Sequence, residues 1–263
     1  MIRNTPLQHI KTAYGQIAVK VWQDTHTLST LAPVVLLHDS LGCIQLWRQF
    51  PGLLAQATRR RVIAYDRAGF GHSAPRNGYI GDDFIEAEAQ TVFAELLKAK
   101  EIDQFIVMGH SVGGEMAVNV AAAYPERCVG LITESAQSVL EPITRAGILE
   151  AQQLFADPEQ FKRLARYHGE KTAWVLSAWI DTWLGAAFDH WSLDPVLPSV
   201  KCPTLVIHGE LDEYGTTAQA KRIADGVSGP AQLELMPGIH HVPHREAEQQ
   251  VLTMLANFMA TLA

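Results

Sequence analysis

The stretch FIVMGHSVGG, residues 105–114, joins a continuous apolar run to a Gly-x-Ser-x-Gly turn. The run has no polar alternation, which is typical of a strand buried on both faces in a parallel sheet. Glycines on both sides of the serine permit a tight turn, and a helical pattern follows over residues 112–124. A strand, a tight turn and a helix in this order predict that Ser111 is a nucleophile. Its hydroxyl would stand at a helix N-terminus, which favours developing negative charge.

Other apolar runs lie on both sides of this stretch and predict further strands of the same sheet. They cover residues 33–38, 61–65, 129–133 and 204–208, with a shorter run at 233–236. Helical periodicity covers residues 83–98, 112–124 and 246–262. Two short runs around Tyr14 and Gly15, within residues 7–22, predict an antiparallel hairpin. This alternation predicts an α/β fold with a mostly parallel central sheet flanked by helices.

One region, residues 137–195, breaks the alternation because it has a helical pattern and no strand candidate. Asp157 followed by Pro158 predicts the start of one helix, and residues 172–184 predict a second. We therefore expect a helical cap inserted into an α/β core. The core takes residues 1–136 and 196–263, and the cap takes residues 137–195.

The cap contains four of the six tryptophans of the chain: Trp174, Trp179, Trp183 and Trp191. Trp179 and Trp183 are one helical turn apart and share a face with Val175. Most tryptophans at such spacing pack a helix against a core. We expect a mixture here, in which one or two of them line an apolar ligand cavity beneath the cap. Trp179 and Trp183 are therefore candidate pocket residues.

Composition and charge exclude several classes of protein. The chain has 263 residues, with 21 Lys and Arg against 28 Asp and Glu, so its formal charge is −7. Its 48% of apolar residues excludes intrinsic disorder, and the acidic balance without basic clusters argues against a nucleic-acid partner. No apolar run is long enough to cross a membrane, and the first residues lack the apolar region of a signal peptide. Three widely spaced cysteines predict buried free thiols in a reducing compartment, so we expect a cytoplasmic protein.

A serine hydroxyl is a poor nucleophile unless a base removes its proton. In this architecture the acid and then the histidine follow the serine along the chain. Asp212 follows the run at 204–208, and the carboxyl end of a strand points into the crevice where such folds bind ligands. A histidine-rich loop comes next, at residues 237–244. Glu134 also follows a strand and competes with Asp212 as the acid; its other expected role is a hydrogen bond at the hinge of the cap.

Five motifs together resemble the α/β-hydrolase family over nearly the whole chain. They are HDSLG at 38–42, YDRAGFGHS at 65–73, GHSVGG at 109–114, HGELDEYG at 208–215 and PGIHHVPHRE at 237–246. The last motif implies that His241 is the catalytic histidine, next to His240 where the family commonly has glycine. By the same resemblance the backbone N–H groups of Ser40 and Val112 form the oxyanion hole. Asp39 replaces the first glycine of the usual His-Gly-x-Gly loop, and aspartate tolerates a left-handed backbone better than most residues.

Other polar side chains near these motifs are expected to be structural. Asp66 should fix a loop, and Glu115 should be paired within the core. His244 should cap a helix start or form a salt bridge with Glu246. A metal site built from the three histidines of the last motif is not expected, because adjacent residues seldom converge on one ion.

The resemblance implies a serine hydrolase that cleaves a small carboxylic ester, thioester or lactone through an acyl-enzyme, with Ser111, Asp212 and His241 as the triad. It implies no cofactor and no metal. His110 and Glu134 are further candidate pocket residues. The expected partner is a small ester-like substrate, without nucleic acid or membrane, and a homodimer is left open.

Two alternatives stay open. Carbon–carbon bond hydrolases of ring-cleavage products keep a Ser-Asp-His triad, but they often have Trp soon after the catalytic histidine, where this chain has Val242 and Pro243. Triad-bearing relatives that act as small-molecule receptors or signalling partners would differ by slow, near-stoichiometric product release. Haloalkane dehalogenases and epoxide hydrolases resemble the fold, but they use Asp at the position of Ser111.

Overall fold

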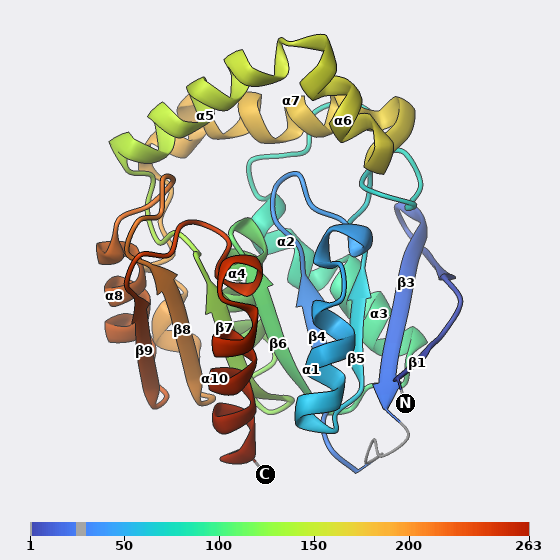
Figure 1. The fold of residues 1–263 in the computed structure, drawn as a ribbon, viewed down its shortest axis with the longest axis vertical. Coiled ribbons are helices and arrows are strands. Elements are labelled where there is room, and N and C mark those ends of the chain that lie inside the picture. The colour runs from blue at the N-terminus through green and yellow to red at the C-terminus, as the bar shows by residue number, and fades with distance from the viewer. Residues whose placement is uncertain (1, 25–29, 263) are drawn as a thin grey trace.

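The computed structural model describes residues 2–24 and 30–262, and one nine-stranded sheet runs through them (Figure 1). The strands are β1 (Ile2–Asn4), β2 (Gln8–Thr12), β3 (Gly15–Asp24), β4 (Val34–Leu37), β5 (Val62–Tyr65), β6 (Phe105–His110), β7 (Cys128–Glu134), β8 (Thr204–Gly209) and β9 (Ala231–Met236). Their order in the sheet is β1-β3-β5-β4-β6-β7-β8-β9, with β2 paired to β3. The pairs from β5 to β9 in this order are parallel, and β1, β2 and β3 add an antiparallel edge.

Helices cover both faces of the sheet (Figure 1). One face carries α1 (Phe50–Thr58) and α10 (Glu248–Ala260); the other carries α2 (Phe84–Gln90), α3 (Val92–Ala99), α4 (Val112–Ala123) and α8 (Thr217–Gly226). Successive side chains of a strand point to opposite faces. Val34 and Leu36 of β4 therefore join the core beside α1, whereas Val35 and Leu37 join the core beside α4. Burial on both faces explains why a central strand is a continuous apolar run.

The structure confirms the α/β fold with its parallel sheet, the hairpin and all the predicted strands, but one predicted helix is broken in two. Residues 83–98 form α2 and α3, because Thr91 leaves helical geometry with φ −112° and ψ −104°. The Thr91 hydroxyl donates to the carbonyl of Ala87 at 2.7 Å, a contact that bends helices. The helix predicted at residues 246–262 is α10, and a separate short helix, α9 (Pro243–Glu246), precedes it.

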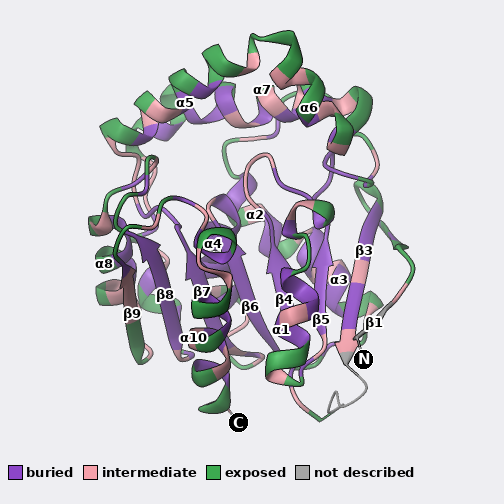
Figure 2. Cartoon of the chain, in the orientation of Figure 1, coloured by how far each residue is buried: buried purple, intermediate pink, exposed green. Residues whose placement is uncertain are grey.

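A layer of three helices lies beyond the carboxyl ends of the parallel strands (Figure 1). It consists of α5 (Pro142–Phe155), α6 (Pro158–His168) and α7 (Thr172–Trp183). Asp157 begins α6 as predicted, since its carboxylate accepts the N–H of Glu159 at 2.8 Å. A β-bridge between Val139 and Ser192 brings the two ends of the segment together. The outward side of these helices is exposed and the side toward the sheet is largely buried (Figure 2).

Short 3-10 turns cover Ile44–Trp47, Gly169–Lys171, Ala186–His190 and Leu197–Ser199. The three cysteines, Cys43, Cys128 and Cys202, are buried free thiols, as predicted. Among residues 2–24 and 30–262, every helix is too short or too polar to span a bilayer.

Candidate active site

Ser111 stands on the tight turn between β6 and α4. Its backbone has φ 54° and ψ −129°, a conformation that costs a residue with a side chain about 1–3 kcal/mol. The flanking glycines are needed for space: a Cβ at Gly109 would lie 1.9 Å from the carbonyl oxygen of Gly113, and one at Gly113 would lie 2.2 Å from that of Leu37. The N–H of Ser111 donates to the carbonyl of Glu134 at 2.8 Å, which ties the turn to β7. The strand–turn–helix geometry predicted around this serine is therefore present.

His241 and Asp212 lie in contact, although they belong to different loops. Asp212 follows β8 and His241 follows β9, and these two strands are neighbours. Nδ1 of His241 is 2.9 Å from each carboxylate oxygen of Asp212, whose side chain is 1% exposed. Burial works to raise the pKa of Asp212, but the hydrogen bond and charge of His241 lower that pKa overall. A carboxylate only accepts hydrogen bonds, so Nδ1 of His241 carries a proton and Nε2 is free to accept one.

Further contacts hold this pair in place. Oδ1 of Asp212 accepts the N–H of Tyr214 at 2.8 Å, and Nε2 of His208 lies 3.6 Å from Oδ2. The N–H of His241 donates to Oε2 of Glu213 at 3.2 Å. Within the described residues no hydrogen bond joins the Ser111 hydroxyl to His241, although both side chains line one pocket. Such bonds are often long in ligand-free enzymes and tighten when substrate binds.

The loop after β4 brings Ser40 to the same pocket. Oδ1 of Asp39 accepts the N–H of Leu41 at 3.0 Å, and the carbonyl of Asp39 accepts the N–H of Gly42 at 3.1 Å. In the part of the chain that the structure describes, the N–H groups of Ser40 and Val112 donate to no other protein atom. Two free backbone donors beside a serine are what an oxyanion hole requires.

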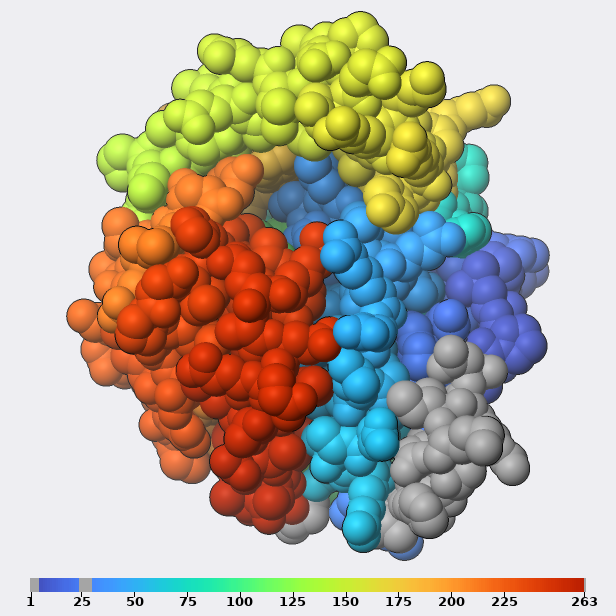
Figure 3. Space-filling model, viewed as in Figure 1, coloured from blue at the N-terminus to red at the C-terminus, as the bar shows by residue number. Residues whose placement is uncertain are grey.

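The pocket lies between the sheet edge and the helices α5 and α7, and it encloses about 160 Å³. Figure 3 shows a hollow between this helical layer and the rest of the molecule. His110, Trp179 and Trp183 line the pocket, in agreement with their candidate status. Trp183 is otherwise buried, whereas Trp179 is only partly buried, and a role of either in ligand binding stays a prediction. Apolar side chains dominate the upper wall, where Ile148 of α5 joins the two tryptophans.

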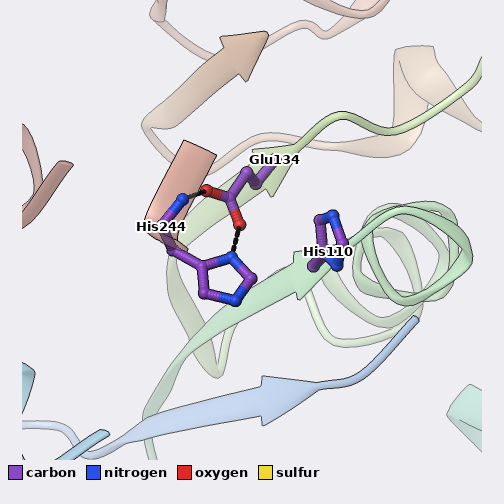
Figure 4. A group of neighbouring side chains, drawn as sticks. All are labelled: His110, Glu134 and His244. Atoms are coloured by element: carbon purple, nitrogen blue, oxygen red, sulfur yellow. Dashed lines mark hydrogen bonds and ion pairs between the residues drawn. The ribbon is translucent and has the colours of Figure 1, made fainter. Parts of the chain in front are cut away.

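Figure 4 shows a second group of side chains beside the turn: His110, Glu134 and His244. Glu134 accepts the N–H of His244 at 2.7 Å, and its other oxygen lies 2.6 Å from Nδ1 of His244. Glu134 is fully buried and lies outside the pocket lining, so its candidacy as a pocket residue and its expected bond at the cap hinge are wrong. The expected salt bridge of His244 with Glu246 is also wrong, because Glu246 pairs with His240. Burial explains both corrections. Glu134 and His244 are buried, and a buried charge needs a partner inside the protein, so these two side chains pair with each other.

The same group is the one cluster in the described residues whose ligand atoms could hold a metal ion, since these atoms lie within 4.8 Å of one another. However, Nδ1 of His244 already contacts Glu134, and both ring nitrogens of His110 contact other oxygen atoms. A metal ion bound to His110 would have to displace one of that ring's two contacts. The arrangement therefore fits a hydrogen-bonded cluster better than a metal site.

Two acidic residues expected to be structural behave differently. Asp66 fixes loops as predicted, with its carboxylate accepting the N–H groups of Ile44 at 2.6 Å and His72 at 2.7 Å. The prediction that Glu115 is paired is wrong. One of its oxygens accepts the N–H of Gln137 at 3.3 Å, and the other has no partner in the described chain. Burial raises the pKa of Glu115 well above its ordinary value, which favours the neutral form of this side chain, a form that needs no counterion.

Sequence reasoning missed several pocket residues. Tyr214 lines the pocket, and its ring centroid is 4.8 Å from that of His241. Asp39 also lines it, and its place at the usual glycine of the HDSLG loop was a signal that the sequence offered. Thr144 and Ile148 gave no signal, because a helical pattern alone does not tell which face of α5 looks into a cavity.

Comparison with known proteins agrees with this geometry. Residues 32–179 match the alpha/beta hydrolase fold family, which is more than half of the chain. Serine hydrolase BPHL of Mus musculus is 29% identical over 229 residues, covering 82% of this chain and 75% of that protein. The human protein of that name is matched over 66% of its length. The putative carbamate hydrolase RutD of Rhizobium rhizogenes is 28% identical over 252 residues, covering 83% of this chain and 89% of that protein.

The crystal structure of VinJ superposes with a TM-score of 0.76 at 22% identity, over 99% of this chain and 100% of that one. At this identity the superposition supports the fold alone. The superposition, the family match, the motifs and the geometry of the turn at Ser111 lead to one conclusion. The chain belongs to the α/β-hydrolase fold family of hydrolases.

Proposed function

We propose that this protein is a serine hydrolase that cleaves a small carboxylic ester, thioester or lactone through an acyl-enzyme. One observation carries the proposal. A serine on a strained turn shares a pocket with a histidine whose Nδ1 is bonded to a buried carboxylate. The same contacts favour Asp212 over Glu134 as the acid, since Glu134 is occupied by His244.

In the first half-reaction Oγ of Ser111 attacks the carbonyl carbon of the substrate while Nε2 of His241 takes the hydroxyl proton. Asp212 stabilises the imidazolium that forms. The N–H groups of Ser40 and Val112 donate to the developing oxyanion, and one such donor is typically worth about 3 kcal/mol of barrier. The bond to the leaving alcohol or thiol then breaks, and His241 returns the proton to it.

In the second half-reaction a water molecule attacks the acyl carbon and gives a proton to His241. The oxyanion forms in the same two-donor site, and its collapse breaks the bond between the acyl carbon and Oγ. His241 returns its proton to Oγ, which restores the Ser111 hydroxyl as the carboxylic acid leaves. Apart from the substrate and this water molecule, the steps use side chains and backbone N–H groups of this chain.

The pocket supports a small substrate with an apolar portion, because it encloses about 160 Å³ and its upper wall is formed by Trp179, Trp183 and Ile148. The segment 137–195, which carries this wall, would act as a cap that selects the substrate. Relatives named as a serine hydrolase and a putative carbamate hydrolase support hydrolysis, while the choice of ester-type bonds is our proposal.

A substrate panel tests the proposal. Purified wild type and Ser111→Ala are assayed with p-nitrophenyl esters, thioesters, lactones and a ring-cleavage dienoate. We expect turnover of at least one ester-type substrate and a loss of roughly 10⁴–10⁶ in kcat for Ser111→Ala with its fold intact. Turnover of the dienoate alone would assign carbon–carbon bond hydrolysis instead. Release of one product per protein molecule, without further turnover, would assign a receptor.

A further inference from the structure

His110 follows directly on β6 and precedes the proposed nucleophile, and both of its ring nitrogens lie against oxygen atoms. Nε2 is 2.8 Å from the backbone carbonyl oxygen of His241, and Nδ1 is 3.3 Å from Oδ2 of Asp39. A carbonyl oxygen and a carboxylate only accept hydrogen bonds. A neutral imidazole would turn one lone pair toward one of these oxygens. The two contacts, a hydrogen bond through Nε2 and an ion-pair distance at Nδ1, are both favourable when both nitrogens carry protons, so the geometry favours an imidazolium.

Two other buried histidines, His38 and His168, contact the loop after β4, but their rings are neutral. The protonated state is therefore specific to His110. Nε2 of His38 accepts the N–H of Arg67 at 3.0 Å, and Nδ1 of His168 accepts the N–H of Gly71 at 3.0 Å. A ring nitrogen that accepts a backbone N–H has no proton, so both rings are neutral. Burial is the main reason that the pKa values of His38 and His168 are lowered.

The surroundings of His110 compensate the cost of a buried charge. Burial by itself would lower the pKa of His110, but Asp39, Glu134 and the carbonyl of His241 raise it above its ordinary value. Asp39 has its own pKa lowered, since His110 outweighs the effect of burial on that carboxyl. The titratable and charged groups around this site are Asp39 and His38 from the loop after β4, Glu134 from β7, and His241, His244 and Arg245 from the segment after β9.

The contacts of His110 join two parts of the proposed machinery. Asp39 precedes Ser40, whose N–H is the second oxyanion donor, and the carbonyl of His241 belongs to the general base itself. We propose that His110 is a positioning residue whose imidazolium clamps the oxyanion loop, through Asp39, to the backbone of His241. The inference rests on the proposed function, because it concerns the alignment of that site. It gives a purpose to Asp39, the residue that replaces the usual glycine of the loop.

The protonation state is tested first, on the wild type. In spectra of protein carrying ¹⁵N-labelled histidine, His110 should show two protonated ring nitrogens at neutral pH, whereas His38 and His168 should each show one. The His110 signals are assigned by their loss in His110→Gln. A single protonated nitrogen on His110 in the wild type would overturn the inference.

Kinetics test the clamp with His110→Gln, Asp39→Asn and the double variant, using the best ester of the substrate panel. We expect each single variant to lose about ten- to a hundredfold in kcat with little change in KM, because the misplaced groups act on the transition state. The double variant should be no slower than the worse single one, since both remove the same contact. Multiplied losses, or single variants as fast as wild type, would overturn the clamp.

The pH profile separates positioning from mere stability. When pH rises through the raised pKa of His110, above 6.5, the wild type should lose the clamp and its kcat/KM should fall. His110→Gln has no such proton to lose. Its kcat/KM should therefore be lower than that of the wild type at neutral pH and should not fall as pH rises through this range. His168→Gln, the matched loss of a buried neutral histidine, should lower Tm yet keep the fall. An unchanged profile in His110→Gln would leave only a structural role and overturn the inference.

A fluorophosphonate probe distinguishes failure of this inference from failure of the proposed function. If wild type is labelled at Ser111 and His110→Gln is labelled at the same rate, the clamp is refuted and the serine hydrolase stands. If wild type is not labelled at Ser111, the proposed function fails and the clamp has nothing to align.

Discussion

Asp212→Asn removes one charge from the proposed triad and keeps the shape of the side chain. In the structure, Oδ1 accepts the N–H of Tyr214 at 2.8 Å, so the amide oxygen of an asparagine is held at that position. The amide NH₂ then takes the place of Oδ2, which lies 2.9 Å from Nδ1 of His241. The amide oxygen at the Oδ1 position is also 2.9 Å from Nδ1, but it already accepts the N–H of Tyr214. We therefore expect the amide NH₂ to donate to a deprotonated Nδ1, which moves the ring proton to Nε2. His241 then cannot accept the proton of Ser111.

The wrong tautomer typically costs about 10⁴ in kcat, or about 5 kcal/mol of barrier, with little change in geometry. Glu134→Gln is the matched control, since it makes the same chemical change at the competing carboxylate. Glu134 contacts His244 and not His241. We therefore expect Glu134→Gln to keep kcat within about tenfold, even if its stability falls.

The assay is steady-state hydrolysis of an ester with a small acyl group, so that contacts with the proposed cap contribute little to the rate. Circular dichroism shows whether both variants are folded. Labelling by a fluorophosphonate reports the nucleophile separately. If Glu134→Gln loses about 10⁴ and Asp212→Asn stays near wild type, the acid belongs to β7 and our assignment is refuted.

Three further substitutions test the proposed cap, the tight turn at Ser111 and a buried carboxyl group. Trp179→Leu should shift the ratio of kcat/KM between bulky and small esters while leaving the rate with a small unselective probe nearly unchanged; equal losses on all esters would contradict a lining role. Gly113→Ala should lower the free energy of unfolding by about 1–3 kcal/mol in urea titrations, because its methyl group would lie 2.2 Å from the carbonyl oxygen of Leu37. Burial raises the pKa of Glu115 in the folded state, so the contribution of this group to stability falls as pH rises above 4.5, where the unfolded chain ionises. Glu115→Gln should remove this loss, and its advantage in Tm over wild type should grow with pH; a constant difference would show that Glu115 is charged in the folded protein.

The sequence predicts the central sheet well because its strands are buried on both faces. A run such as residues 34–37 has to be apolar throughout, and this pattern needs no knowledge of its neighbours. The turn at Ser111 is equally readable, since only glycines fit at 109 and 113. The proposed Asp212–His241 pair was located by motif order, because both residues follow strands that end at one edge of the sheet.

Features that depend on a partner far along the chain could not be predicted. Glu134 and His244 are 110 residues apart, and nothing local in either segment indicates that they pair. The two side chains pair because both are buried, and His244 is buried because α9 packs against the sheet at β8. The break of the helix at Thr91 is similar, because its apolar periodicity continues unchanged across the bend.

The most direct test of the account is to trap the acyl-enzyme. Wild type is mixed with an activated ester of the panel, quenched in acid during the first turnover, digested and analysed by mass spectrometry. We predict that the peptide containing Ser111 gains the mass of the acyl group, that the adduct decays as the free acid appears, and that Ser111→Ala shows no adduct. Steady turnover with an unmodified Ser111 peptide, or an adduct on another residue, would contradict the central claim.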